Sequence, residues 1–234
     1  MLRTGTLVLF ASLFVFRVSS AEPLLAEHFD VDTKTTAETL ATYPAFSRVG
    51  NGSLVVEQGV LRFTPAAGDD ELILTQGFPG DLLIRAAIGG RSVTGPPGSW
   101  GAGLQLGGLR LIFHPGFAER IPGVRGAFRA DCGQTCRTTA DMGFIPREGL
   151  LHPWSVIVCG AETGNFYATV RKARLPRRTF HAWVTETGYR DASPIGLAAG
   201  GAGTGTAWFD DIVIEGDSPE VAEVCQRDAS GVGP

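Results

Sequence analysis

The stretch that decides the fold is T-A-W-F-D-D-I-V-I-E-G, residues Thr206–Gly216, which follows the glycine-rich run Gly196–Gly205. Alternate residues of an extended chain point to opposite faces of a sheet, so this stretch predicts one long strand. Its residues fall on two faces: Ala207, Phe209, Asp211 and Val213 on one, and Trp208, Asp210, Ile212 and Ile214 on the other. As the last strong strand signal, it must close a sheet that earlier segments have built. The glycine-rich run has no phosphate-loop Lys and precedes a strand, which predicts a long flexible turn.

Short apolar and β-branched runs, separated by turn signals, fill the rest of the chain, which contains 32 Gly and 14 Pro among 234 residues. About a dozen such runs, without a long helical period, predict an all-β fold, a two-sheet antiparallel jelly-roll sandwich. Residues 32–42 predict a short helix or an extended loop. The expected strands are Leu24–Phe29, Ser53–Glu57, Val60–Phe63, Glu71–Thr75, Asp81–Ile88, Gly101–Leu106, Leu109–His114, Val124–Arg129, Trp154–Cys159, Asn165–Arg171, Phe180–Glu186 and Thr206–Glu215.

The N-terminus has the pattern of a secretory signal peptide. Arg3 precedes an apolar run, Leu7–Phe16, and small residues follow at Ser19 and Ala21. The run is short for a bilayer crossing, which needs roughly 20 residues. We therefore expect a signal peptide at residues 1–21, a single β-sandwich domain at 22–216, a C-terminal tail at 217–234 that is loose beyond Cys225, and a secreted protein, extracellular or periplasmic.

The charge balance limits the partners. The chain has 20 basic and 24 acidic residues, and removing residues 1–21 takes away two arginines and no acid, which leaves a net charge of −6. This balance argues against nucleic acid and anionic membrane surfaces as partners. No run after the N-terminus is long and apolar enough to span a membrane.

All four cysteines, Cys132, Cys136, Cys159 and Cys225, lie beyond the expected cleavage point. An exported protein normally oxidises its cysteines, and four of them allow three pairings. The simplest pairing joins Cys132 to Cys136 and Cys159 to Cys225, which would tether the C-terminal tail. A zinc site is disfavoured because the chain has only one close pair, with three residues between its cysteines.

Four of the expected strands combine an apolar face with a face that carries Arg, His, Tyr or Trp. If these second faces lie side by side, they form an aromatic and cationic surface on one sheet. Sugar rings stack on aromatic side chains while polar groups bind their hydroxyls, so this surface predicts carbohydrate binding. Trp154 and Trp208 are expected to pack inside. The candidate ligand-binding residues are Arg85, Trp100, Arg110, His114, Tyr167, Arg171 and Trp183, with core packing as the alternative for Trp100 and Trp183.

Several segments together resemble a known superfamily. They are F-P-G-D-L-L-I-R-A-A-I (Phe78–Ile88), S-W-G-A-G-L-Q-L-G (Ser99–Gly107), H-P-W-S-V-I-V (His152–Val158), T-G-N-F-Y-A-T-V (Thr163–Val170) and P-I-G-L (Pro194–Leu197) leading into W-F-D-D-I-V-I. Their order, across about residues 45–216, resembles the concanavalin A-like lectin and glucanase sandwiches. The nearest likeness is to laminin-G-like modules and secreted bacterial domains of the 3-keto-disaccharide hydrolase type. The resemblance implies a jelly roll whose final strand pairs near the N-terminal one, often with a carbohydrate on the concave sheet.

The sequence lacks the paired carboxylates, E-x-D-x-E on one strand, of glycosidases with this fold. Asp211 and Glu215 are four residues apart, too far for direct partnership, so the catalytic residues stay unknown and catalysis is disfavoured. Asp210 and Asp211, with Asp30, predict a structural calcium site, since calcium takes carboxylate oxygens. The alternative is one solvated aspartate and one that accepts backbone hydrogen bonds at the strand edge.

These observations favour a secreted β-sandwich module that binds a carbohydrate or another extracellular polymer. The resemblance implies a first alternative, a glycoside hydrolase or lyase of the 3-keto-disaccharide hydrolase type. A second alternative is a structural or interaction domain of an exported surface assembly.

Overall fold

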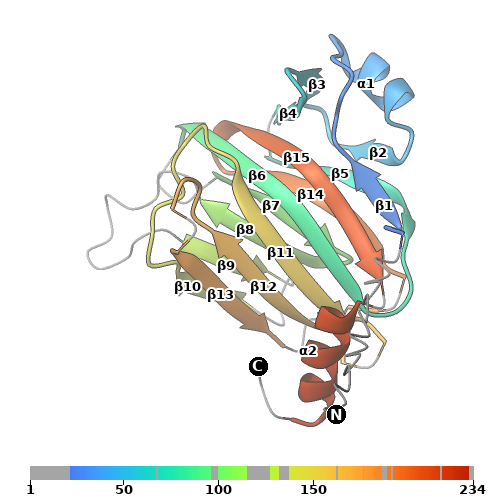
Figure 1. Cartoon of the computed structure of the whole chain (residues 1–234). Coiled ribbons are helices and arrows are strands. Elements are labelled where there is room, and N and C mark those ends of the chain that lie inside the picture. The colour runs from blue at the N-terminus through green and yellow to red at the C-terminus, as the bar shows by residue number, and fades with distance from the viewer. Residues whose placement is uncertain are drawn as a thin grey trace, which may run out of the picture.

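The structure is a computed structural model that describes residues 22–66, 68–95, 100–114, 127–131, 137–161, 163–175, 177–185, 189–190, 192–216 and 218–231. The predicted signal peptide, Cys132 and Cys136 lie outside these ranges. Two antiparallel sheets pack face to face, which confirms the predicted sandwich (Figure 1). None of the helices in the described ranges is long and apolar enough to cross a bilayer.

One sheet has eight strands in the order β13-β12-β11-β6-β15-β4-β3, with β1 paired to β15. Leu25 lies opposite Ile214, so the final strand pairs with the N-terminal one, as the resemblance implies. The strands of this sheet are β1 (Leu25–Glu27), β3 (Ser53–Glu57), β4 (Val60–Thr64), β6 (Leu82–Thr94), β11 (His152–Cys159), β12 (Asn165–Arg171), β13 (Thr179–Val184) and β15 (Thr204–Gly216).

The other sheet has seven strands in the order β10-β9-β8-β7-β14-β5-β2. Three of them, β2, β10 and β14, lie in segments that the sequence did not predict as strands. The strands of this sheet are β2 (Phe46–Val49), β5 (Gly68–Gly77), β7 (Trp100–Leu106), β8 (Leu109–His114), β9 (Ala127–Asp131), β10 (Arg137–Asp141) and β14 (Pro194–Gly201).

The prediction of a flexible turn at Gly196–Gly205 is wrong, because most of this run forms β14 in the middle of the seven-stranded sheet. Every second side chain of β14 is apolar and buried in the core: Ile195, Leu197 and Ala199. Strands β7 and β5 pair with it on both sides and satisfy its backbone groups. The run therefore forms a strand despite its glycines, because every second side chain is apolar and a strand pairs with it on each side.

Aromatic side chains from both sheets fill the space between them. Trp154 of β11 lies 5.5 Å from Phe113 of β8 and 5.7 Å from Phe128 of β9, measured between ring centroids. Trp154 is 2% exposed, as the sequence predicts. Each fully buried side chain of this size stabilises the fold by roughly 1.5–3 kcal/mol, so this core holds the two sheets together.

A β-bulge at Asp211 interrupts the alternation of β15. Asp210 lies opposite Ala87 and Val213 opposite Arg85, so β15 has one residue more than β6 between these pairs. Asp211 has a φ of 50°, a left-handed conformation that Asp tolerates better than most residues. The bulge moves Ile212 into the core beside Phe209. The predicted face that joins Phe209 to Asp211 and Val213 is therefore wrong beyond Asp210.

Two helices lie outside the sandwich. The segment for which the sequence left helix and loop open contains α1 (Thr36–Thr42), capped by the Thr35 side chain. In the tail, α2 (Pro219–Ala229) begins at the N-cap Ser218 and packs on the outer face of the eight-stranded sheet. Figure 1 shows α2 in red at the lower edge of that sheet.

The tail is helical beyond Cys225 as far as Ala229, which corrects the prediction of a loose segment there. Cys159 and Cys225 form a disulfide, and Val221 packs with Leu83 in a small apolar cluster. Further along α2, Asp228 accepts hydrogen bonds of 2.9 and 3.1 Å from the amide of Asn165. The disulfide and the contacts on both sides of it hold the whole helix against the sheet.

Candidate functional site

The predicted binding residues do not share one surface. Arg85, Tyr167, Arg171 and Trp183 lie on the outer face of the eight-stranded sheet, on β6, β12 and β13. Arg110 and His114 lie on β8 of the other sheet, and Trp100 lies in the core. Strand order in space, which the sequence does not reveal, separates these groups.

Two of the predicted ligand contacts are corrected by burial. Trp100 is 1% exposed and packs over Gly205, where a Cβ atom would come within 2.5 Å of the indole ring. His114 is 5% exposed, and its Nδ1 lies 2.8 Å from the carbonyl oxygen of Trp100. Burial lowers the pKa of His114. Both side chains are part of the packed interior, so neither is accessible to a ligand.

Tyr167 and Trp183 do meet on the outer face of the eight-stranded sheet. Their ring centroids are 6.0 Å apart, and Tyr167 also stacks on His181 at 5.8 Å. The Tyr167 hydroxyl lies 2.9 Å from His181 Nδ1. This half-exposed aromatic group combines flat apolar rings with polar atoms, the composition that a sugar ring requires.

Arg85 lies between acidic side chains beside a cavity of about 270 Å³. Its guanidinium is 2.7 Å from a carboxylate oxygen of Glu215 and 3.6 Å from one of Glu220, which belongs to α2. Arg171 and Asp211 also line this cavity. The cavity therefore contains two of the predicted cationic residues, Arg85 and Arg171. Acidic side chains neutralise the charge of Arg85.

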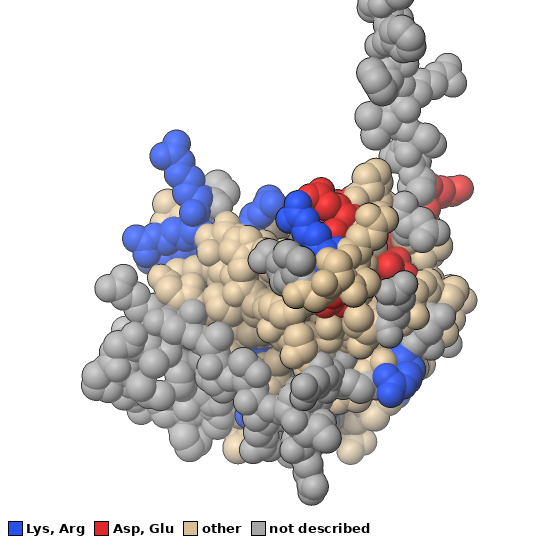
Figure 2. Space-filling model, turned by 90° about the horizontal axis from the view of Figure 1, so that it is seen from below, with Lys and Arg blue, Asp and Glu red and all other residues tan. Residues whose placement is uncertain are grey.

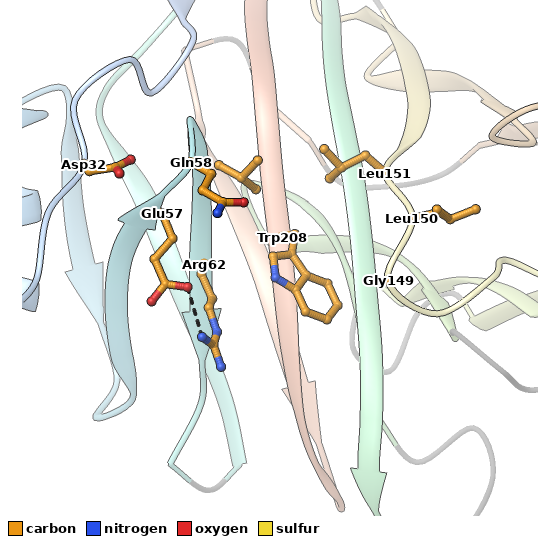
Figure 3. Close-up of a pocket in the computed structure, with 9 residues that line it drawn as sticks. Asp32, Glu57, Gln58, Arg62, Gly149, Leu150, Leu151 and Trp208 are labelled. Carbon is orange, nitrogen blue, oxygen red and sulfur yellow. Dashed lines mark hydrogen bonds and ion pairs between the residues drawn. The ribbon is translucent and has the colours of Figure 1, made fainter.

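A larger pocket, of about 520 Å³, surrounds Trp208 on the same outer face, toward the β3–β4 edge of the sheet (Figure 3). Trp208 lies opposite Arg62 of β4 on one side and Gly89 of β6 on the other. Its ring is half-buried and forms part of the lining between these strands. The residues that line the pocket are Asp32, Glu57, Gln58, Val60, Arg62, Gly149, Leu150, Leu151 and Trp208.

Two loops build the walls of this pocket. Gln58 and Gly59 both have positive φ, 55° and 75°, as a type I′ turn requires, and this turn joins β3 to β4 at the rim. The opposite wall, Gly149–Leu151, packs directly on β6. The approach is so close that a Cβ atom on Gly89 would lie 2.7 Å from the carbonyl oxygen of Leu150. The glycine at position 89 thus allows the loop to approach the sheet.

Charged groups occupy the β3–β4 side of the pocket. Arg62 Nη1 lies 3.1 Å from Glu57 Oε2, and both side chains are about half exposed. Asp32 accepts a hydrogen bond of 3.4 Å from the backbone N–H of Gly59. The pocket therefore offers donors and acceptors beside an indole ring, which suits a polyhydroxylated ligand better than an apolar one.

The sequence did not predict this site, because Trp208 was expected to pack inside. Ala207 and Phe209, its neighbours in β15, are fully buried, so the alternation of the strand places Trp208 outside. An aromatic residue on the non-core face of a predicted strand was the signal that could have found it.

Two acids of the predicted calcium site, Asp210 and Asp211, have other partners. Asp211 Oδ1 lies 3.0 Å from Nδ1 of His28, and Asp210 accepts a 2.8 Å hydrogen bond from the backbone N–H of Asp211. The hydrogen bond to Asp211 raises the pKa of His28, and burial raises the pKa of Asp210. In the described ranges, no three His, Cys, Asp or Glu side chains form a group that could hold a metal ion. In this structure Asp211 therefore forms a histidine–carboxylate pair with His28.

No protein-family model matches this sequence, and no curated protein matches it. Solved structures do share its fold. The exoplasmic/lumenal domain of VIP36, in a Ca2+/Man2-bound form, aligns over 86% of this chain and 91% of its own at 11% identity, with a TM-score of 0.56. A legume lectin-like domain from Entamoeba histolytica aligns over 86% and 100% at 9% identity, with a TM-score of 0.52. A sialidase aligns over 86% of this chain and 19% of its own at 9% identity, with a TM-score of 0.53. At these identities the likeness shows the fold alone, a sandwich of two antiparallel sheets that this chain shares with these domains.

Proposed function

We propose that this chain, a sandwich of the legume-lectin-like type, is a secreted module that binds carbohydrate in the pocket around Trp208. The observation that carries the proposal is the half-buried indole beside the Arg62–Glu57 pair, Gln58 and Asp32 in a cavity of about 520 Å³. The apolar face of a sugar ring stacks on the indole, while the charged and amide groups bind its hydroxyls.

Lectin structures with this fold support the same class of ligand, and one of them, VIP36, was solved with a mannose-containing ligand. The Tyr167–Trp183 group on the same sheet face provides a second place for ring stacking. Arg85 lies on β6, a strand between this group and β15, which carries Trp208. Arg110 lies on the other sheet and belongs neither to the Tyr167–Trp183 group nor to the Trp208 pocket.

A glycoside hydrolase is the second candidate, because the pocket contains two carboxylates, Asp32 and Glu57. Glycosidases require one carboxyl group that stays protonated near neutral pH, which burial normally achieves. Here Asp32 is exposed, and the Glu57 side chain is 57% exposed and paired with Arg62. This exposure favours binding over hydrolysis. Release of reducing sugar from a bound oligosaccharide, abolished by Glu57→Gln, would support the hydrolase instead.

A glycan-array screen of the wild-type chain tests the function directly, followed by titration of the best oligosaccharide. Trp208→Ala should abolish the signal, whereas Val93→Ala, which alters an exposed apolar side chain of the same sheet, should retain it. Absence of any glycan signal from the wild type would contradict the proposal.

Two further predictions belong to it. Cleavage of the signal peptide would leave Glu22 as the first residue of the exported protein, which N-terminal sequencing checks.

The predicted structural calcium at Asp30, Asp210 and Asp211 stays a prediction, and thermal unfolding with calcium and with a chelator tests it.

A further inference from the structure

The hairpin between β12 and β13 carries a dense group of basic side chains. Between positions 171 and 178 the sequence has five basic residues and no acid, although the whole chain has a net charge of −4. We call Arg171, Lys172, Arg174, Arg177 and Arg178 the basic hairpin. Its four arginines are exposed, and Lys172 is half-buried.

Among the described residues, the positive charge of the basic hairpin is not neutralised by acids. Some other arginines in the described part of the chain do pair with acids, as Arg62 does with Glu57 and Arg91 with Glu148. Across the described ranges, no acidic side chain lies within ion-pair distance of the five basic ones. Figure 2 shows Lys and Arg side chains projecting at the left, the side on which β12 and β13 lie in Figure 1, while Asp and Glu gather nearer the middle and right.

Hydrogen bonds order the main chain from which these side chains project. The N–H of Lys172 donates to the carbonyl of Arg178 at 2.9 Å, and the N–H of Arg178 donates to that of Leu175 at 2.9 Å. At the base, the buried His152 accepts a 3.0 Å hydrogen bond from the N–H of Ala173. A preformed turn of this kind loses little conformational entropy when it binds a partner.

We propose that the basic hairpin binds an anionic polysaccharide, one that carries sulfate or carboxylate groups. Guanidinium groups form paired hydrogen bonds with both kinds of anion. Arg171 also lines the cavity beside Arg85, so the basic hairpin continues into the sheet face on which the proposed carbohydrate pocket lies. This surface is separate from that pocket and adds a second, charge-dependent contact to the proposed function.

Two other classes of polyanion fit the hairpin less well. Its sequence has no aromatic residue on which the bases of a single-stranded nucleic acid could stack. A membrane surface requires a broad apolar face, and the one large apolar side chain described at the tip is Leu175, which is 52% exposed.

Binding of the full chain to dextran sulfate, to uncharged dextran, to phosphatidylserine-containing vesicles and to a single-stranded oligonucleotide tests the proposal. The hairpin variant is Arg174→Gln, Arg177→Gln and Arg178→Gln together. The matched control is Arg91→Gln, Arg190→Gln and Arg227→Gln, which removes three exposed arginines elsewhere. Thermal unfolding verifies that both variants are folded.

We expect the wild type to bind dextran sulfate with an affinity that falls as salt rises, because bound polyanions release counterions. The hairpin variant should bind at least roughly tenfold more weakly and with less salt dependence, and the control should change by less than about threefold. Equal losses in the two variants, no binding of dextran sulfate, or tighter binding of vesicles or oligonucleotide would overturn the proposal. Trp208→Ala should leave dextran sulfate binding unchanged, so this test is independent of the carbohydrate pocket.

Discussion

At the level of single residues, Asp211 determines how β15 presents its side chains. Its left-handed backbone adds one residue to the strand, moves Ile212 into the core and leaves the Asp211 carboxylate exposed beside His28. A sequence pattern reveals alternation but not the point at which it shifts. The sequence therefore predicted the strand correctly but assigned the side chains after Asp210 to the wrong faces of the sheet.

The His28–Asp211 pair predicts a pH-dependent contribution to stability. The hydrogen bond to Asp211 raises the pKa of His28 from its ordinary value of 6.5 in the folded state, so protonation favours folding. This contribution is fully present below pH 6.5 and is lost as the pH rises through the folded-state pKa. Urea unfolding of the wild type and His28→Gln should show a larger difference at pH 5 than at pH 8.5. Asp211→Asn should also remove the pH dependence, and a difference independent of pH would contradict the role of this pair.

At the level of elements, backbone packing decides where glycine is required. A Cβ atom on Gly103 of β7 would lie 1.9 Å from the carbonyl oxygen of Leu111, whereas one on Gly108 would meet nothing within 4 Å. Gly103→Ala should therefore reduce the free energy of unfolding by about 1–3 kcal/mol, and Gly108→Ala by much less. Chemical denaturation of both variants checks this contrast. Equal stability of the two would show that the sheet relaxes around the added methyl group.

The helix α2 depends on its disulfide. The Cys159–Cys225 bond closes a loop with a sequence separation of 66 residues, for which the chain-entropy model gives about 4 kcal/mol of stabilisation. Cys159→Ser with Cys225→Ser should lower the unfolding temperature and increase amide hydrogen exchange in α2 before the rest of the domain. Unchanged exchange in α2 would mean that the contacts of Val221 and Asp228 suffice to hold it.

Elements with strong alternation and clear turn signals, such as β3, β4, β11 and β12, could be predicted from the sequence with nearly their observed bounds. In β14 the signal was present but hidden, since small residues take every second position between Ile195, Leu197 and Ala199. The short α2 could not be predicted from periodicity, because its apolar contact is limited to Val221, Val224 and Cys225.

At the level of the whole molecule, the order of strands in space determines which side chains can act together. The expected surface is divided: Tyr167, Trp183, Arg85 and Arg171 lie on one sheet, and Arg110 lies on the other. The fold also creates a pocket from segments more than 140 residues apart, with Glu57 and Arg62 beside Trp208. No sequence pattern reports such a meeting, because it depends on β15 closing the sheet between β4 and β6.

The measurement that tests the central claim most directly is the affinity of wild type and Trp208→Ala for the oligosaccharide that the glycan array selects, with Val93→Ala as the control. An aromatic contact of about 1.5 kcal/mol corresponds to roughly tenfold in affinity, so Trp208→Ala should bind at least tenfold more weakly than both other proteins. Equal affinity of Trp208→Ala and the wild type would contradict the assignment of this pocket as the carbohydrate site.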